Sequence, residues 1–235
     1  MPSQSEASYG ARLRHAQQIL SFIQTYPTYA PPRQEESIAN FAAFLQNITD
    51  TNTAETVYKQ NYNTAVAARY ALCKIADNSI SKSLVPIRAV VLSQYGKNSV
   101  EFKQINTIVA KMRKGNILHT VAADKITPVK ISQSQQSYGS QSKLFSDIIA
   151  TLSTLPNYNP SNPALQIVEL QTVLDQTLTL SDSVSLNYAR YIQTNSSRAQ
   201  LYAELSDRIQ RIKNYVKAQY GLDSVEYRFI RNLSA

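Results

Sequence analysis

Apolar side chains recur along this chain every three or four positions, which is the period of an amphipathic α-helix. In residues 8–25 these positions are Leu13, Ala16, Ile19, Leu20 and Ile23. In residues 33–49 they are Ile38, Phe41, Phe44, Leu45 and Ile48. Pro27 stops the first run, because proline cannot continue a helix. The pattern predicts two helices joined by a short proline-rich loop and, extended along the chain, an all-α protein.

Two further helices follow in the same half. Asn52 with Glu55 fits a capping box, which predicts that a long third helix opens there and runs to about residue 77. A fourth helix runs to residue 95. Pro86 is tolerable only in its first turn, so we expect this helix to start near Ser83.

The fourth helix is followed by a tight turn and a new cap. Gly96 supplies the left-handed stop that glycine favours after a helix. Asn98 with Glu101 reads as a second capping box, which opens a short closing helix. One half of the chain therefore predicts a four-helix bundle with a short extra helix.

The second half repeats the first. The triplet Ser-Tyr-Gly occurs at residues 8–10 and again at 137–139, and apolar positions such as Phe41 and Leu170 stay in step at this offset of 129. After Cys73 the offset becomes 125, and SQYGKNSVEFKQI (93–105) aligns with AQYGLDSVEYRFI (218–230). These matches predict a tandem duplication of a module of roughly 100 residues.

The repeat also predicts the domain boundaries. We expect a first module at residues 1–113, a joining segment at 114–136 and a second module at 137–235. Ile117, Leu118, Val121, Ile126, Val129 and Ile131 make the joining segment too apolar for a free linker. It is therefore expected to lie on the surface of a bundle.

Two short motifs recur in both halves, and we interpret both as structural. The P-x-Y-x-P element reads as a rigid turn with its tyrosine packed across it, and the Tyr-Gly element as a helix end. The functional alternatives are a proline-rich partner motif for the first element and a ligand-binding loop for the second. One glycine, however, gives the backbone little freedom to wrap a phosphate. The motif residues are Pro27, Tyr29, Pro31, Tyr95 and Gly96, with Pro156, Tyr158, Pro160, Tyr220 and Gly221.

These motifs carry a resemblance. Two helices split by P-x-Y-x-P, a long helix and a closing Y-G-x-[N/D]-S-x-E-[Y/F] resemble bacterial helical-bundle proteins that carry this module once or twice. The likeness covers both halves of the chain but rests on two short motifs. It implies the helical-bundle fold and brings no activity or functional residue with it.

The net charge of +8 is concentrated at the closing end of each half. Residues 79–135 hold nine basic and two acidic side chains, and residues 205–235 hold six and three. The candidate anion-binding residues are Lys103, Lys111, Arg113, Lys114, Lys125 and Lys130. Such a strip binds phosphates in many nucleic-acid-binding proteins, whereas in most helical proteins it is a solvated face.

Little site chemistry is visible. One Cys and two His exclude a disulfide framework and cysteine-rich or histidine-built metal sites of the usual kind. Cys73 is interpreted as a small buried hydrophobe, because a reactive thiol needs an activating neighbour. No nucleotide-binding, metalloprotease or calcium-binding motif occurs. We therefore expect neither an enzyme, nor a cofactor, nor a small-molecule substrate.

The ends and the hydropathy add one expectation each. The N-terminus lacks the pattern of a signal peptide, and no stretch is apolar enough to span a membrane. The compartment stays open, with the cytoplasm favoured.

The remaining composition suggests interaction. Only 17% of residues are charged, and there are 15 tyrosines, a residue that is enriched at protein interfaces. With the duplication, this favours a non-enzymatic structural or protein-interaction protein that self-associates or binds a protein partner. The alternative is a basic helical protein that binds nucleic acid or another anionic surface.

Overall fold

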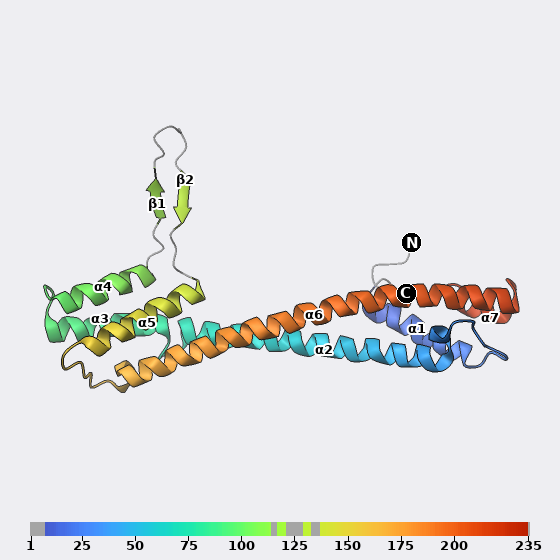
Figure 1. The fold of residues 1–235 in the computed structure, drawn as a ribbon, viewed down its shortest axis with the longest axis horizontal. Coiled ribbons are helices and arrows are strands. Elements are labelled where there is room, and N and C mark those ends of the chain that lie inside the picture. Colours follow the sequence, from blue (N-terminus) through green and yellow to red (C-terminus); the bar gives the residue numbers. More distant parts are fainter. Residues whose placement is uncertain (1–7, 114–116, 121–128, 133–136, 235) are drawn as a thin grey trace. The chain divides into compact units, whose positions relative to one another are not determined.

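The computed structural model describes residues 8–113, 117–120, 129–132 and 137–234, and the side chains of 8–113 and 137–234. Within these residues the fold is helical apart from two four-residue strands, so the prediction of a helical protein is confirmed and the two strands were not predicted (Figure 1). The elements are α1 (Tyr9–Ile23), η1 (Gln34–Glu36), α2 (Ile38–Tyr70), η2 (Ala71–Ile75), α3 (Ile80–Tyr95), α4 (Val100–Arg113), β1 (Ile117–Thr120), β2 (Val129–Ser132), α5 (Tyr138–Thr154), η3 (Pro163–Leu165), α6 (Ile167–Tyr220) and α7 (Val225–Ile230). Here η1 and η3 are 3₁₀ turns and η2 is a single π-helical turn.

The expected break before a third helix is wrong. α2 runs through Asn52 and Glu55 as one helix of 33 residues. Both side chains have partners on α6, since the Asn52 amide donates to the Tyr202 hydroxyl at 2.9 Å and Glu55 accepts from Arg198 at 2.8 Å. The Asn52 Oδ1 atom, which a cap would have used as its acceptor, has no hydrogen-bond partner among the described residues.

The start of α3 also differs from the prediction. The helix begins at Ile80, and the Ser79 hydroxyl accepts from the backbone N–H of Lys82 at 3.4 Å. Pro86 therefore lies inside the helix rather than in its first turn. Its ring is exposed, so water can reach the carbonyl one turn earlier that loses its backbone donor.

The next turn has the predicted form with a shifted cap. Gly96 and Gly221 end α3 and α6 with φ of +86° and +99°, a region in which other residues are strained. The side chain that caps the following helix is a serine, Ser99 before α4 and Ser224 before α7, and not the residue before it. The closing helix is short only in the second half, with six residues in α7 against fourteen in α4.

The chain forms two compact units, and each draws on both halves of the sequence. Unit 1 is Met1–Gln60 with Tyr188–Ala235, and unit 2 is Asn61–Asn187. This division differs from the expected modules at 1–113 and 137–235. The reason is that α2 and α6 are each one long helix with its first part in one unit and its last part in the other.

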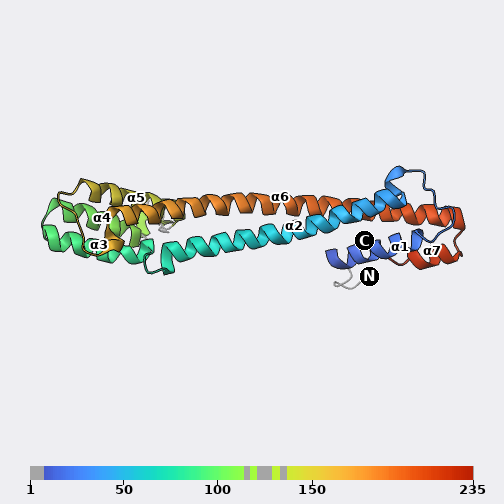
Figure 2. The ribbon, with the colours of Figure 1, turned by 90° about the horizontal axis from the view of Figure 1, so that it is seen from below.

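Unit 1 is closed by α1 and α7, which lie side by side (Figure 2). Its core comes from α1, the first part of α2, the last part of α6 and α7. The core residues are Ala16, Ile19, Ile23, Tyr26, Phe41, Phe44, Leu45, Ile48, Tyr202, Leu205, Ile209, Ile212, Val216 and Ile230.

Unit 2 is formed by the segments that unit 1 does not use, from the last part of α2 to the first part of α6. α4 packs against both α3 and α5 (Figure 1), and the first part of α6 completes the core. The largest fully buried side chains of this core are Phe145, Ile80, Ile87, Ile105, Ile148, Leu152 and Leu170.

Residues that correspond to each other at the two sequence offsets occupy similar places in the two cores. At the offset of 129, Ile19, Phe41 and Leu45 of unit 1 correspond to Ile148, Leu170 and Leu174 of unit 2. At the offset of 125, Ile80, Leu84, Ile87 and Val91 of unit 2 correspond to Leu205, Ile209, Ile212 and Val216 of unit 1. The first part of each half therefore packs with the last part of the other half.

The joining segment contains the two strands. β1 and β2 pair antiparallel, with Ile117 opposite Ser132 and Thr120 opposite Val129. The side chains of residues 114–136 lie outside the described residues. The expected packing of this segment on a bundle surface therefore stays a prediction.

Candidate functional site

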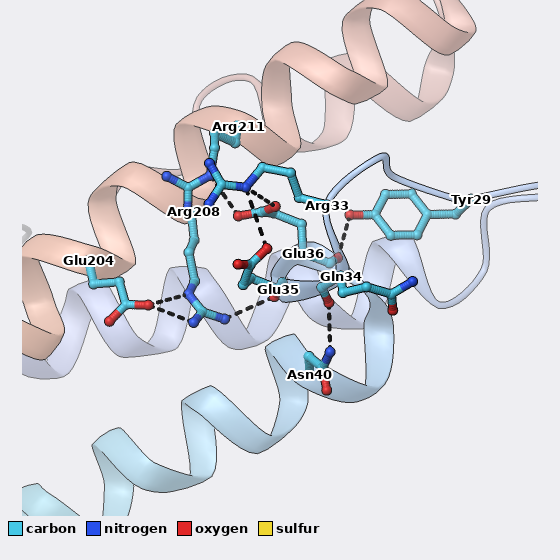
Figure 3. A network of polar contacts seen from close by, with 9 residues as sticks. All are labelled: Tyr29, Arg33, Gln34, Glu35, Glu36, Asn40, Glu204, Arg208 and Arg211. Carbon is cyan, nitrogen blue, oxygen red and sulfur yellow. Dashed lines mark hydrogen bonds and ion pairs between the residues drawn. The ribbon is translucent and has the colours of Figure 1, made fainter.

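The most buried charge in unit 1 belongs to Glu36, which follows the proline-rich loop. Its side chain is 3% exposed, and the Nε atom of Arg211 donates to Oε1 at 2.6 Å (Figure 3). Arg33 contributes a longer contact of 3.8 Å to Oε2. A buried carboxylate is costly unless it is paired, so these arginines make the position of Glu36 tolerable.

A second arginine of α6 extends this network. Arg208 donates to the backbone carbonyl of Glu35 at 2.9 Å and to the Glu204 carboxylate at 2.6 Å (Figure 3). Its guanidinium carbon also lies 4.0 Å from the centre of the Phe44 ring. Arg208 and Arg211 thus tie the turn at residues 33–37 to α6.

A small cavity of about 270 Å³ adjoins the network, and Glu36, Arg211 and Tyr215 are among its lining residues. The exposed Glu35 carboxyl has a lowered pKa, first because its own backbone amide donates to it and then because Arg33 is near. Basic and acidic side chains balance here, so the arrangement serves as a structural clamp and leaves no charge free for a ligand.

The tyrosines of the two motifs link one half of the chain to the other. In unit 2 the Tyr95 hydroxyl donates to the carbonyl of Pro156 at 2.6 Å. In unit 1 the Tyr220 hydroxyl donates to the carbonyl of Pro27 at 2.5 Å. Each helix-end tyrosine therefore fastens the proline loop of the opposite half.

The loop tyrosines make the same bond in both units. The hydroxyls of Tyr29 and Tyr158 donate to the carbonyls of Glu36 and Leu165, each at 3.0 Å. Burial, and then the neighbouring Tyr95, raises the pKa of Tyr158 to about 12. Burial and the charge of Glu36 raise the pKa of Tyr29 still further.

The backbone of these loops is alike as well. Thr28 and Asn157, each directly after the first proline, have φ of 59° and 61°. Pro31 and Pro160 lie further along the loops, where Pro160 is buried and Pro31 half-buried.

Arginine–tyrosine contacts repeat in the same crosswise manner. The guanidinium carbon of Arg69 lies 4.0 Å from the ring centre of Tyr138 in unit 2. That of Arg198 lies 4.9 Å from the ring centre of Tyr9 in unit 1. Each of these contacts lies inside one unit and joins segments from the two halves of the chain.

Of the six predicted anion-binding residues, Lys103, Lys111 and Arg113 have described side chains, and these three do not line one common pocket. Lys103 borders a groove of about 690 Å³ between α4 and α5. Arg113 borders a different hollow, between α3 and α4, and Lys111 lines neither. Lys114 and Lys125 lie outside the described residues, and of Lys130 only the backbone, in β2, is described.

The hollow beside Arg113 contains an arginine that the sequence did not single out. Arg88 of α3 donates through Nε to Oδ1 of Asn106 at 2.7 Å, and both line this hollow of about 480 Å³. Arg88 and Arg113 are 25 positions apart, so only the packing of α3 on α4 places them at one hollow. No local signal could have found the pair.

An exposed apolar patch on unit 1 was also missed. Leu222, Val225 and Phe229 are 57%, 57% and 54% exposed, and the Phe229 ring stacks on that of Phe22 with centroids 5.2 Å apart. We call these four residues the α7 patch. The spacing of Val225 and Phe229 predicts one helix face, but only the structure shows that this face is left uncovered in the described chain.

The remaining chemical candidates are weak in this structure. Cys73 is buried within η2, and burial raises the pKa of its thiol, which opposes a reactive thiolate. Among residues 8–113 and 137–234, no three His, Cys, Asp or Glu side chains gather as a metal site would require. In the same residues, no helix is both long enough and apolar enough to cross a membrane.

No protein-family model, no curated protein and no solved structure matches this chain. The resemblance to bacterial helical-bundle proteins, drawn from the motifs, stays a prediction.

Proposed function

We propose that this protein is a non-enzymatic helical interaction protein that self-associates through the α7 patch. The observation that carries the proposal is that Leu222, Val225 and Phe229 are exposed in and next to α7. The exposed Phe229 ring also stacks on the half-buried Phe22 ring. Burying a side chain of this size stabilises an interface by about 1.5 to 3 kcal/mol before the costs of association. Scattered single apolar residues are common on protein surfaces, but three exposed apolar residues within eight positions, one of them stacked on a second ring, favour an interface.

The use of the other chemical groups supports the same proposal. The tyrosines of the repeated motifs donate to backbone carbonyls, and the buried carboxylate is paired with arginine. Because these groups are used inside the fold, we infer that the protein binds a partner through the exposed surfaces of its helices.

Unit 2 provides a matched comparison for the patch. By the offset of 125, Phe229 corresponds to Gln104, and by the offset of 129, Phe22 corresponds to Thr151. Gln104 and Thr151 line the open groove between α4 and α5. The equivalent position in unit 2 therefore carries a polar residue without loss of the fold, so Phe229→Gln is expected to fold.

The experiment is light scattering coupled to size-exclusion chromatography over a range of protein concentrations. The full chain is expected to form dimers or larger species as concentration rises, and Phe229→Gln to remain monomeric. Gln104→Ala, at the equivalent exposed position of unit 2, is the control and is expected to behave as the parent chain. A parent chain that stays monomeric at all concentrations, or a Phe229→Gln variant that assembles equally well, would contradict self-association through this patch.

We also infer that the chain is a tandem duplication of one helical module whose two copies have exchanged partners. The crosswise bonds of Tyr95 to Pro156 and of Tyr220 to Pro27 support this, as do the paired core positions. In such an arrangement neither copy is a folding unit by itself, because each compact unit needs the first part of one copy and the last part of the other.

A further inference from the structure

The hollow between α3 and α4 of unit 2 carries uncompensated positive charge. Its lining is Arg88, Asn106, Val109, Ala110 and Arg113, which includes two guanidinium groups and no acidic side chain. Within the described residues, neither arginine takes part in an ion pair. Two like charges at one open hollow attract an anion to it.

The guanidinium group of Arg88 is held in place by two contacts within unit 2. Its Nε–H is taken by Asn106 at 2.7 Å, and its guanidinium carbon lies 5.5 Å from the centre of the buried Phe102 ring. In the described chain, the four N–H groups on the two terminal nitrogens make no further hydrogen bond that would compete with a ligand. A guanidinium held in this way loses less freedom on binding than a free surface arginine.

The surrounding charge has the same sign. Residues 79–135 carry nine basic side chains against the acidic Glu101 and Asp124. Glu101 lies in the first turn of α4 and is not part of the lining. The last turn of α4 adds Lys111 beside Arg113, so the local field favours a ligand with more than one negative charge.

We propose that this hollow is a binding site for a phosphate group. Guanidinium groups recognise phosphate through parallel N–H···O bonds, and two arginines match the two charges of a phosphate monoester or one end of a pyrophosphate. Arg88 of α3 would donate from its terminal nitrogens and Arg113 from the last turn of α4, while Val109 and Ala110 contribute the apolar part of the lining. The phosphate can belong to a small phosphorylated compound or to a nucleic-acid backbone, and the experiment separates these sources.

The test uses the full-length chain. Pyrophosphate is titrated by isothermal calorimetry, and a labelled single-stranded oligonucleotide by fluorescence anisotropy, both at low salt. Arg88→Gln and Arg113→Gln are each expected to weaken binding about tenfold or more, because each removes charge-assisted hydrogen bonds. Arg228→Gln and Arg231→Gln remove the same charge from exposed positions of unit 1 and are the controls.

The outcomes decide both the site and its source. Pyrophosphate binding that is lost in the two unit 2 variants and kept in the controls supports a site for small phosphate compounds. Oligonucleotide binding alone with the same dependence supports a backbone phosphate. No binding of either probe, or equal weakening in all four variants, would overturn the proposal. Arg113 lies exposed at the end of its helix, so its variant tests the site even where Arg88→Gln alters the fold. The result does not depend on self-association, which involves the other unit.

Discussion

A single substitution at Arg211 tests whether its ion pair with the buried Glu36 stabilises unit 1. Replacing Arg211 with Met keeps most of the side-chain volume but removes the donor that lies 2.6 Å from the Glu36 carboxylate. The Glu36 side chain is only 3% exposed, so water cannot hydrate its carboxylate once the arginine is removed. Arg33, at 3.8 Å and with 55% of its side chain exposed, compensates only weakly.

The magnitude follows from this geometry. Breaking a fully buried ion pair costs about 3 to 5 kcal/mol. Arg211 is 34% exposed, and Arg33 stays near, so we expect the free energy of unfolding of unit 1 to fall by about 2 to 3 kcal/mol. Unit 2 suggests the rescue, because Leu165 occupies the position equivalent to Glu36 and is buried without a charge. The double variant with Glu36→Leu should therefore recover to within about 1 kcal/mol of the parent.

The assay is urea unfolding followed by far-ultraviolet circular dichroism, with hydrogen exchange to assign each transition to a unit. Two compact units need not unfold together, so the two transitions are fitted separately where they differ. With a slope of about 2 kcal/mol/M, the unit 1 midpoint of Arg211→Met should fall by about 1 to 1.5 M. Arg228→Met, an exposed arginine of α7, is the control and should change stability by less than about 0.5 kcal/mol. The reasoning is refuted when Arg211→Met matches this control, or when Glu36→Leu fails to restore the lost stability.

The remaining predictions concern the tyrosines and one glycine. Tyr95→Phe should lower the stability of unit 2 alone, and Tyr220→Phe that of unit 1 alone. Each change should cost about 1 kcal/mol, because it removes one hydrogen bond from a hydroxyl to a carbonyl. Hydrogen exchange that assigned the two losses to the opposite units would contradict the crosswise arrangement. Tyr26 and Tyr158 have pKa values raised to about 12, while tyrosines of the unfolded chain ionise near pH 10. The stability that these two tyrosines contribute should therefore be fully present below pH 10 and be lost between pH 10 and 12. Ultraviolet titration of tyrosinate that showed ordinary pKa values for all tyrosines would refute this. Gly221→Ala should cost about 1 kcal/mol by urea unfolding, because alanine is strained at a φ of +99°, and an unchanged midpoint would show that this turn relaxes.

The sequence predicted well those features that depend on a few adjacent residues. Helix content, the proline loops and the glycine stops follow from apolar spacing, the fixed φ of proline and the freedom of glycine. The predicted cap at Asn98 lies one residue before Ser99, which caps α4, because asparagine and serine are equally good capping residues. The error at Asn52 has a different origin, since α2 continues through this residue and its amide donates to Tyr202 of α6, 150 positions away.

What only the tertiary structure decided is which segments pack together. The periodicity of α2 and α6 shows an apolar face but not its neighbour, so a compact module within each half was the natural expectation. The structure divides both helices between two units and pairs Tyr95 with the loop of Pro156. Arg88 and Arg113 likewise line one hollow only because α3 packs on α4. Contacts between distant segments depend on the burial of whole helix faces, so they cannot be predicted from local residue spacing.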